Sequence, residues 1–130
     1  MTAHLLDANV LIALTVAEHE HHRTAAAWAG SGVELALCPV VEGALVRFLV
    51  RLGESPSTAQ AVLSALYASG RCAFWPDATS YADTSLDHVV GHRQVTDAYL
   101  LGLAASRGAR LVTFDRALAE QASEHVELLT

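Results

Sequence analysis

Short apolar runs alternate along this chain with longer segments in which apolar residues recur every three or four positions. The short runs have the length of buried strands and the periodic segments that of helices facing a core. Strands alternating with helices predict an α/β domain with three layers and a mainly parallel central sheet of about five strands. We expect residues 1–130 to form this single domain. The predicted strands end at Leu6 and span residues 33–38, 72–75, 110–113 and 124–129.

Turn and capping residues place the predicted helices between these strands. Pro39 suits the first turn of a helix over residues 39–52, and Ser55 or Ser57 suits the cap of the next, which runs to Ala68. Thr96 is a candidate cap for a helix that opens at residues 95–97. The remaining predicted helices follow Asp7, cover residues 23–29 and follow Asp115, and residues 77–90 are predicted as a helix or as short turns.

Two aspartates, Asp7 and Asp115, each stand directly between a predicted strand and a predicted helix. In an open parallel sheet, ligands bind in the crevice beyond the carboxyl ends of the strands. Both side chains are therefore predicted to reach the place where chemistry is usually done. The alternative for each residue taken alone is a helix cap, because aspartate is a favoured capping residue.

Two further acids, Glu42 and Asp97, head the apolar faces of predicted helices. Taken singly, Glu42 can extend to solvent, and Asp97 is explained by the favourable helix dipole. Helix starts and strand ends lie on the same edge of a parallel sheet, so all four acids are predicted to meet there. Four gathered carboxylates repel one another, and a divalent cation removes that cost. Such a site can position water against a phosphodiester.

Composition narrows the possible chemistry further. All eight basic residues are arginine, so mechanisms that need a lysine are excluded, including those of the P-loop enzymes, receiver domains and aspartyl-phosphate phosphatases. The formal net charge of −6 argues against general nucleic-acid binding through long-range attraction. No apolar run is long enough to cross a membrane, and no signal peptide is evident. We therefore expect a cytoplasmic protein whose cysteines, Cys38 and Cys72, stay reduced.

The acids stand in a recognisable order of short motifs. Leu6-Asp7-Ala8-Asn9, Val41-Glu42, Thr96-Asp97-Ala98 and Thr113-Phe114-Asp115 together resemble the PIN-domain ribonucleases, in particular the VapC toxins of bacterial toxin–antitoxin pairs. The resemblance covers nearly the whole chain. It implies an endoribonuclease that depends on Mg²⁺ or Mn²⁺ and cleaves RNA, with a VapB-like antitoxin as partner and a homodimer as its assembly. The 52% hydrophobic content fits a partner or a second copy covering apolar surface.

The resemblance also implies roles for individual residues. The metal ligands would be Asp7 and Asp97 first, with Glu42 and Asp115, while Asn9 and Thr113 would hydrogen-bond the acids or their waters. We single out Arg47, Arg93 and Arg116 as candidate contacts to RNA phosphates, with solvated surface arginines as the alternative. Arg116 stands where the family commonly has an acid or a small polar residue. A PIN-fold binding or regulatory protein without catalysis is the alternative function, and retention of all four acids argues against it.

Overall fold

Five short parallel strands form the centre of the structure, a computed structural model that describes residues 3–130. The strands are ordered β3-β2-β1-β4-β5, and each neighbouring pair is parallel. This confirms the predicted sheet. Their bounds are Ala3–Leu6 for β1, Glu34–Leu37 for β2, Cys72–Phe74 for β3, Arg110–Thr113 for β4 and Val126–Leu128 for β5.

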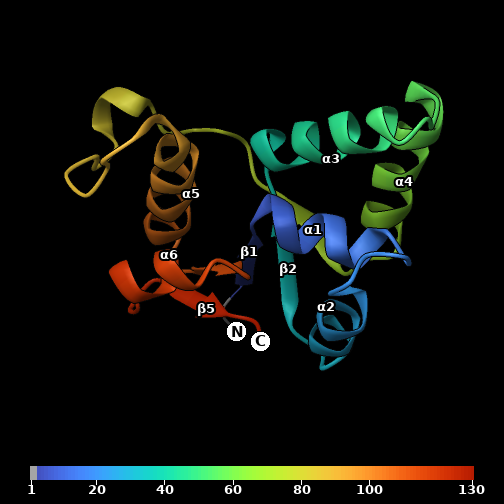
Figure 1. Cartoon of the computed structure of the whole chain (residues 1–130), viewed down its shortest axis with the longest axis horizontal. Helices are drawn as coiled ribbons and strands as arrows, with labels where there is room; N and C mark the ends of the chain where they lie inside the picture. Colours follow the sequence, from blue (N-terminus) through green and yellow to red (C-terminus); the bar gives the residue numbers. More distant parts are fainter. Residues whose placement is uncertain (1–2) are drawn as a thin grey trace.

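Helices flank the sheet on both sides of the view in Figure 1, with α3 and α4 at the right and α5 and α6 at the left. Helix α1 packs against α2 and α3, α3 packs against α4, and α5 packs against β1 and β4. The observed bounds are Ala8–Thr15 for α1, His22–Ala29 for α2, Pro39–Arg51 for α3, Pro56–Ala68 for α4, Val95–Ser106 for α5 and Arg116–Gln121 for α6.

The predicted boundaries of α3 and α4 are confirmed by the local geometry. Pro39 and Pro56 each occupy the first turn of their helix, where no backbone N–H is needed for an internal bond. The Ser55 hydroxyl caps α4 by accepting a hydrogen bond from the Thr58 backbone N–H at 3.1 Å. Gly53, with φ of 100°, makes the turn between the helices in a conformation that L side chains rarely adopt.

The segment before α5 takes the second of its two predicted forms, short turns. Residues 77–90 form no α-helix, Tyr81–Asp83 make a short 3₁₀ turn, η1, and a further turn follows at residues 87–88. A second 3₁₀ turn, η2 over His92–Gln94, leads directly into α5, so the helix begins at Val95 and Gln94 occupies its cap position. Thr96 is therefore already inside the helix, and its prediction as the cap is wrong. The continuous turn makes a capping side chain unnecessary.

The core lies between the sheet and the helices and fixes where the strands end. Leu5 and Leu6 of β1 and Leu111 and Val112 of β4 are fully buried, which anchors both central strands before their polar ends emerge. Neither cysteine forms a disulfide, as predicted, and burial raises the pKa of Cys38 to about 11. No helix within residues 3–130 has the length and apolar character needed to cross a membrane.

Candidate active site

Asp7 lies between strand β1 and helix α1, as the sequence predicts. Its Oδ1 accepts a hydrogen bond from the Ala8 backbone N–H at 2.7 Å, and the side chain caps the helix. The Asp7 backbone N–H donates to the carbonyl of Val112 at 2.9 Å, which ties the residue to the neighbouring strand β4. Only 7% of Asp7 is exposed. Its carboxylate is therefore held in a fixed place at the meeting point of two buried strands.

Thr113, the last residue of β4, connects three parts of the site through one hydroxyl group. Its Oγ1 donates to Asp7 Oδ2 at 2.7 Å and accepts from the Asp115 backbone N–H at 3.0 Å. Asn9 Nδ2 also donates to it, at 3.4 Å. The residue is fully buried, so no water competes for these bonds. Thr113 thus holds the end of β4, the start of α1 and the turn into α6 in one arrangement.

One polar atom of the Asn9 side chain has no hydrogen-bond partner. Its Oδ1 is buried and makes no hydrogen bond to any residue in the described chain. Buried acceptors normally have a donor or an ion beside them, because losing water without replacement costs free energy. An unpaired amide oxygen next to carboxylates fits a site in which a hydrated cation supplies the missing partner.

Asp97 and Asp115 complete the acidic group from the other side. Asp97 lies in the first turn of α5 and is half-buried, whereas Asp115 is exposed and caps α6 by accepting from the Leu118 backbone N–H at 3.1 Å. Both line a small cavity of about 40 Å³, together with His88, Gln94 and Gln121. The cavity is large enough for about one water or ion.

The electrostatic cost of this arrangement appears in the pKa values. The pKa of Asp97 is raised to about 6, first by burial and then by the charges of Asp7 and Asp115. The pKa of Asp7 is also raised, mainly by burial and slightly by Asp115, against the opposing hydrogen bonds from Thr113 and Ala8. The charges of Asp7 and Asp115 both act on Asp97, and a cation bound beside these carboxylates would remove their repulsion.

Glu42 differs from these three acids in its hydrogen-bond partner. It is half-buried on α3, and its Oε2 accepts a 2.6 Å hydrogen bond from the Tyr67 hydroxyl on α4. The charges that raise the pKa of Asp97 are those of Asp7 and Asp115. Burial and the bond to Glu42 raise the pKa of Tyr67, which keeps its hydroxyl protonated and donating. The sequence reasoning missed Tyr67, because it lies 25 residues from Glu42 on a helix without any polar motif.

The donors present fit a hard divalent cation that keeps much of its water shell. Within residues 3–130, no three Asp, Glu, His or Cys side chains surround a single point closely enough to enclose a metal ion. Mg²⁺ typically binds proteins through one or two carboxylates and several waters, so a full cage is not required. The all-oxygen set of Asp7, Asp97 and Asp115 has the chemistry that Mg²⁺ and Mn²⁺ prefer.

The three arginines singled out from the sequence are exposed and lie on three different elements: Arg47 on α3, Arg93 in η2 and Arg116 at the start of α6. Across residues 3–130, the ion pairs formed involve histidines and glutamates rather than these arginines. Arg116 directly follows the acid Asp115 in the sequence.

Known proteins are similar to this chain in sequence and in fold. The family model for the PIN domain matches residues 4–124. The chain is 56% identical to Ribonuclease VapC29 of Mycobacterium tuberculosis, over 88% of this chain and 87% of that protein. It is 42% identical to Ribonuclease VapC38 of the same organism, over 97% of each.

A solved structure extends the likeness to the fold. The crystal structure of VapBC2 from Rickettsia felis, bound to a DNA fragment from their promoter, contains a chain that matches with a TM-score of 0.65. The match covers 99% of this chain and all of that one, at 13% sequence identity. At this identity the likeness concerns the fold alone.

Proposed function

The chain belongs to the PIN-domain family and to the VapC-type ribonucleases within it, and on this basis we propose that it is the endoribonuclease toxin of a type II toxin–antitoxin pair. The observation that carries the proposal is the group formed by Asp7, Asp97 and Asp115, in which burial and the charges of the other two acids raise the pKa of Asp97. An acidic protein without lysine needs a cation there before it can approach a phosphodiester.

Asp7 and Asp97 are the first ligands we assign to a Mg²⁺ or Mn²⁺ ion, with Asp115 beside them. When bound, the cation supplies Lewis acidity, which makes a water more acidic and stabilises negative charge on the phosphate oxygens. Thr113 holds Asp7 through its 2.7 Å hydrogen bond, and the Asn9 amide oxygen is free to accept from a water. Glu42 takes a supporting role from α3, in the orientation set by Tyr67.

The protein's own residues would act mainly by positioning. The hydrogen bonds to Asp7 and the burial of both strand ends fix the carboxylates before the substrate arrives, so little reorganisation is needed during the reaction. Arg47, Arg93 and Arg116 would contact phosphates along the RNA, and Arg116 is nearest in sequence to the acids. Local arginines of this kind offset part of the repulsion between RNA and the net charge of −6.

A VapB-like antitoxin and a second copy of the chain are the partners that we propose in the cytoplasm. The matched crystal structure is a VapBC complex, which supports an antitoxin partner by analogy of fold. Large apolar side chains are exposed at Leu52, Phe74 and Val90, the last with 91% of its surface accessible. Exposed apolar residues of this size are typical of interaction surfaces.

The test uses purified protein and single-stranded RNA in Mg²⁺, in Mn²⁺ and in EDTA, with the new 5′ ends mapped. We expect cleavage with either cation and none in EDTA, because all candidate ligands are oxygens. Asp83→Asn is the matched control, since this exposed acid lies in η1 away from the group. Full activity after exhaustive chelation would refute the metal assignment. RNA binding without any cleavage would favour the non-catalytic binding protein.

A further inference from the structure

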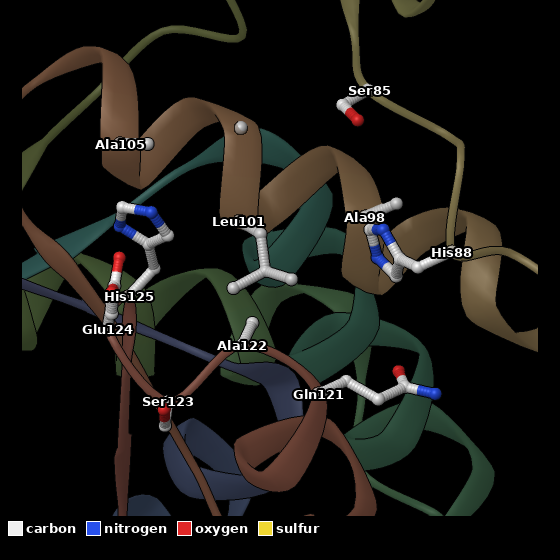
Figure 2. Close-up of a pocket in the computed structure, with 11 residues that line it drawn as sticks. Ser85, His88, Ala98, Leu101, Ala105, Gln121, Ala122, Ser123, Glu124 and His125 are labelled. Carbon is white, nitrogen blue, oxygen red and sulfur yellow. The ribbon is translucent and has the colours of Figure 1, made fainter.

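A second and larger cavity opens beside the acidic group, with a volume of about 520 Å³. It lies between α5, residues 85–88 and residues 121–125 (Figure 2). His88 and Gln121 line this cavity and also the small one that holds Asp97 and Asp115. The two spaces are therefore neighbours, and a molecule held at the carboxylates has the larger cavity within reach. Its size is within the range of about 300–1,000 Å³ that small-ligand pockets occupy.

One side of this cavity is apolar. Ala98, Leu101 and Ala105, with Gly102 between them, come from one side of α5, and the small side chains leave the space open. Figure 2 shows the imidazole rings of His88 and His125 on opposite sides of Leu101. A planar ring fits against such a surface, and imidazole rings are among the side chains on which unpaired RNA bases stack.

The rim of the cavity carries hydrogen-bonding groups without a positive charge. Glu124 and Gln121 supply acceptors, and no arginine is among the lining residues. The Nε2 atom of His88 is buried and has no hydrogen-bond partner in the described part of the chain. A phosphate is disfavoured here because Glu124 is among the lining residues and no arginine lies there to compensate its charge. A neutral ring with polar edges suits the site.

We propose that this cavity binds an unpaired nucleobase of the RNA next to the scissile phosphate, and that guanine is the preferred base. The inference rests on the proposed ribonuclease function. A carboxylate is an acceptor with two oxygens, and guanine alone among the four bases presents a ring N–H and an amino group side by side. Glu124 would accept both hydrogen bonds while Leu101 packs against the face of the ring. His88 Nε2 gains its missing partner from the same nucleotide.

Two short RNA substrates that differ at one position test the preference. One carries guanine beside the cut, and the other carries hypoxanthine, which keeps the ring N–H but lacks the amino group. We expect the wild-type protein to cleave the guanine substrate roughly 10- to 100-fold faster, the discrimination usual for a bidentate contact. Equal rates for the two substrates, at every position within three nucleotides of the cut, would overturn the proposal.

Glu124→Gln links this preference to the cavity. We expect the ratio of the two cleavage rates to fall toward one in this variant, because an amide offers only one acceptor oxygen. Glu120→Gln is the matched control, since Glu120 is exposed on α6 and does not line the cavity, and it should keep the wild-type ratio. A Glu124→Gln protein with an undiminished ratio would place guanine recognition elsewhere.

A binding measurement in EDTA separates this inference from the ribonuclease proposal. The ring signals of His88 and His125 are followed by NMR while a trinucleotide with a central guanine is added, and then its hypoxanthine counterpart. We expect both rings to shift with guanine, and several-fold tighter binding than with hypoxanthine, whether or not the protein cleaves RNA. Unmoved rings would overturn the base site even in an active ribonuclease. Ring signals that respond only to protein concentration would assign the cavity to a second copy instead.

Discussion

The surroundings of Asp7 and Asp97 differ from those of Glu42 on α3. Burial raises the pKa of Asp7 and that of Asp97, and the charge of Asp115 raises both further. Glu42 instead receives a 2.6 Å hydrogen bond from the Tyr67 hydroxyl. The first group keeps an electrostatic cost that the protein alone does not remove, whereas a neutral donor already satisfies Glu42.

This difference distinguishes Asp7 and Asp97, whose repulsion favours cation binding, from Glu42, whose hydrogen bond stabilises the fold. Repulsion retained in the folded protein is released when a cation binds, so it strengthens the preference for the metal-bound state. A carboxylate satisfied by Tyr67 has less to gain from a cation. The comparison therefore favours Asp7, Asp97 and Asp115 as the direct ligands of the proposed cation, and a supporting role for Glu42.

The largest expected effect is on cleavage. Asp97→Asn removes one charge from the cation site while it keeps the size of the side chain. Loss of several kcal/mol of metal-dependent stabilisation lowers the rate by about 10²- to 10⁴-fold. Initial rates on one RNA substrate at saturating Mg²⁺ measure the change. A variant within threefold of the wild-type rate would remove Asp97 from the site.

Thr113→Val removes the hydroxyl group that hydrogen-bonds both Asp7 and Asp115. Valine keeps the shape of threonine but leaves Asp7 Oδ2 and the Asp115 backbone N–H without their buried partner. We expect the free energy of unfolding to fall by about 2–4 kcal/mol, measured by urea denaturation. Thr15→Val is the control, because the Thr15 hydroxyl bonds only carbonyls of its own helix. Equal losses in both variants would contradict the connecting role of Thr113.

The pH dependence of the unfolding free energy in EDTA tests the raised pKa of Asp97. The folded pKa of Asp97, about 6, lies above its ordinary value of 3.8, so the folded protein binds more protons than the unfolded chain between these values. The unfolding free energy therefore falls as pH rises through that window. Asp97→Asn should melt like wild type near pH 4 and higher at pH 7, by about 1 kcal/mol or 3–5 °C once solvent screening is allowed for. A constant difference across the window would contradict the raised pKa.

The smallest expected effect concerns the arginine beside the acids. If Arg116 contacts one phosphate, Arg116→Ala lowers the salt dependence of RNA binding by about one unit in the log–log slope and leaves Mg²⁺ affinity unchanged. Fluorescence anisotropy at several salt concentrations gives the slope. Arg71→Ala provides a comparison far from the acids in sequence. An unchanged slope would show that Arg116 is a solvated surface residue that contacts no phosphate.

Much of the fold could be predicted from the sequence because local signals agreed with the final packing. Prolines, a capping serine and glycine turns mark α3 and α4, and five apolar runs mark the strands. The sequence of segment 77–90 left a helix and short turns open, because it has no comparable start or stop signal. Ser80 and Thr84 make local hydrogen bonds there, and the structure has short turns, η1 among them. Thr96 had the chemistry of a cap, but the helix had already started through η2.

The residues of the candidate site that follow strands could be predicted from the sequence. The contacts between residues far apart in the sequence could not. Because parallel strands end at one edge, Asp7, Thr113 and Asp115 could be placed together from their positions after apolar runs. The bond between Glu42 and Tyr67 depends on how α4 packs against α3, which no local pattern encodes. The same holds for His88, which reaches the acids from an irregular segment.

The most direct test of the account is the melting temperature at pH 7, in EDTA and in excess Mg²⁺, for wild type, Asp97→Asn and Glu42→Gln. The account predicts that Asp97→Asn melts at or above wild type in EDTA and loses most of the gain from Mg²⁺, whereas Glu42→Gln shows no rise in EDTA. Mg²⁺ at 100 times its Kd should stabilise the wild-type protein by about 2.7 kcal/mol. An Asp97→Asn protein that melts clearly lower in EDTA, yet gains as much from Mg²⁺ as wild type, would contradict it.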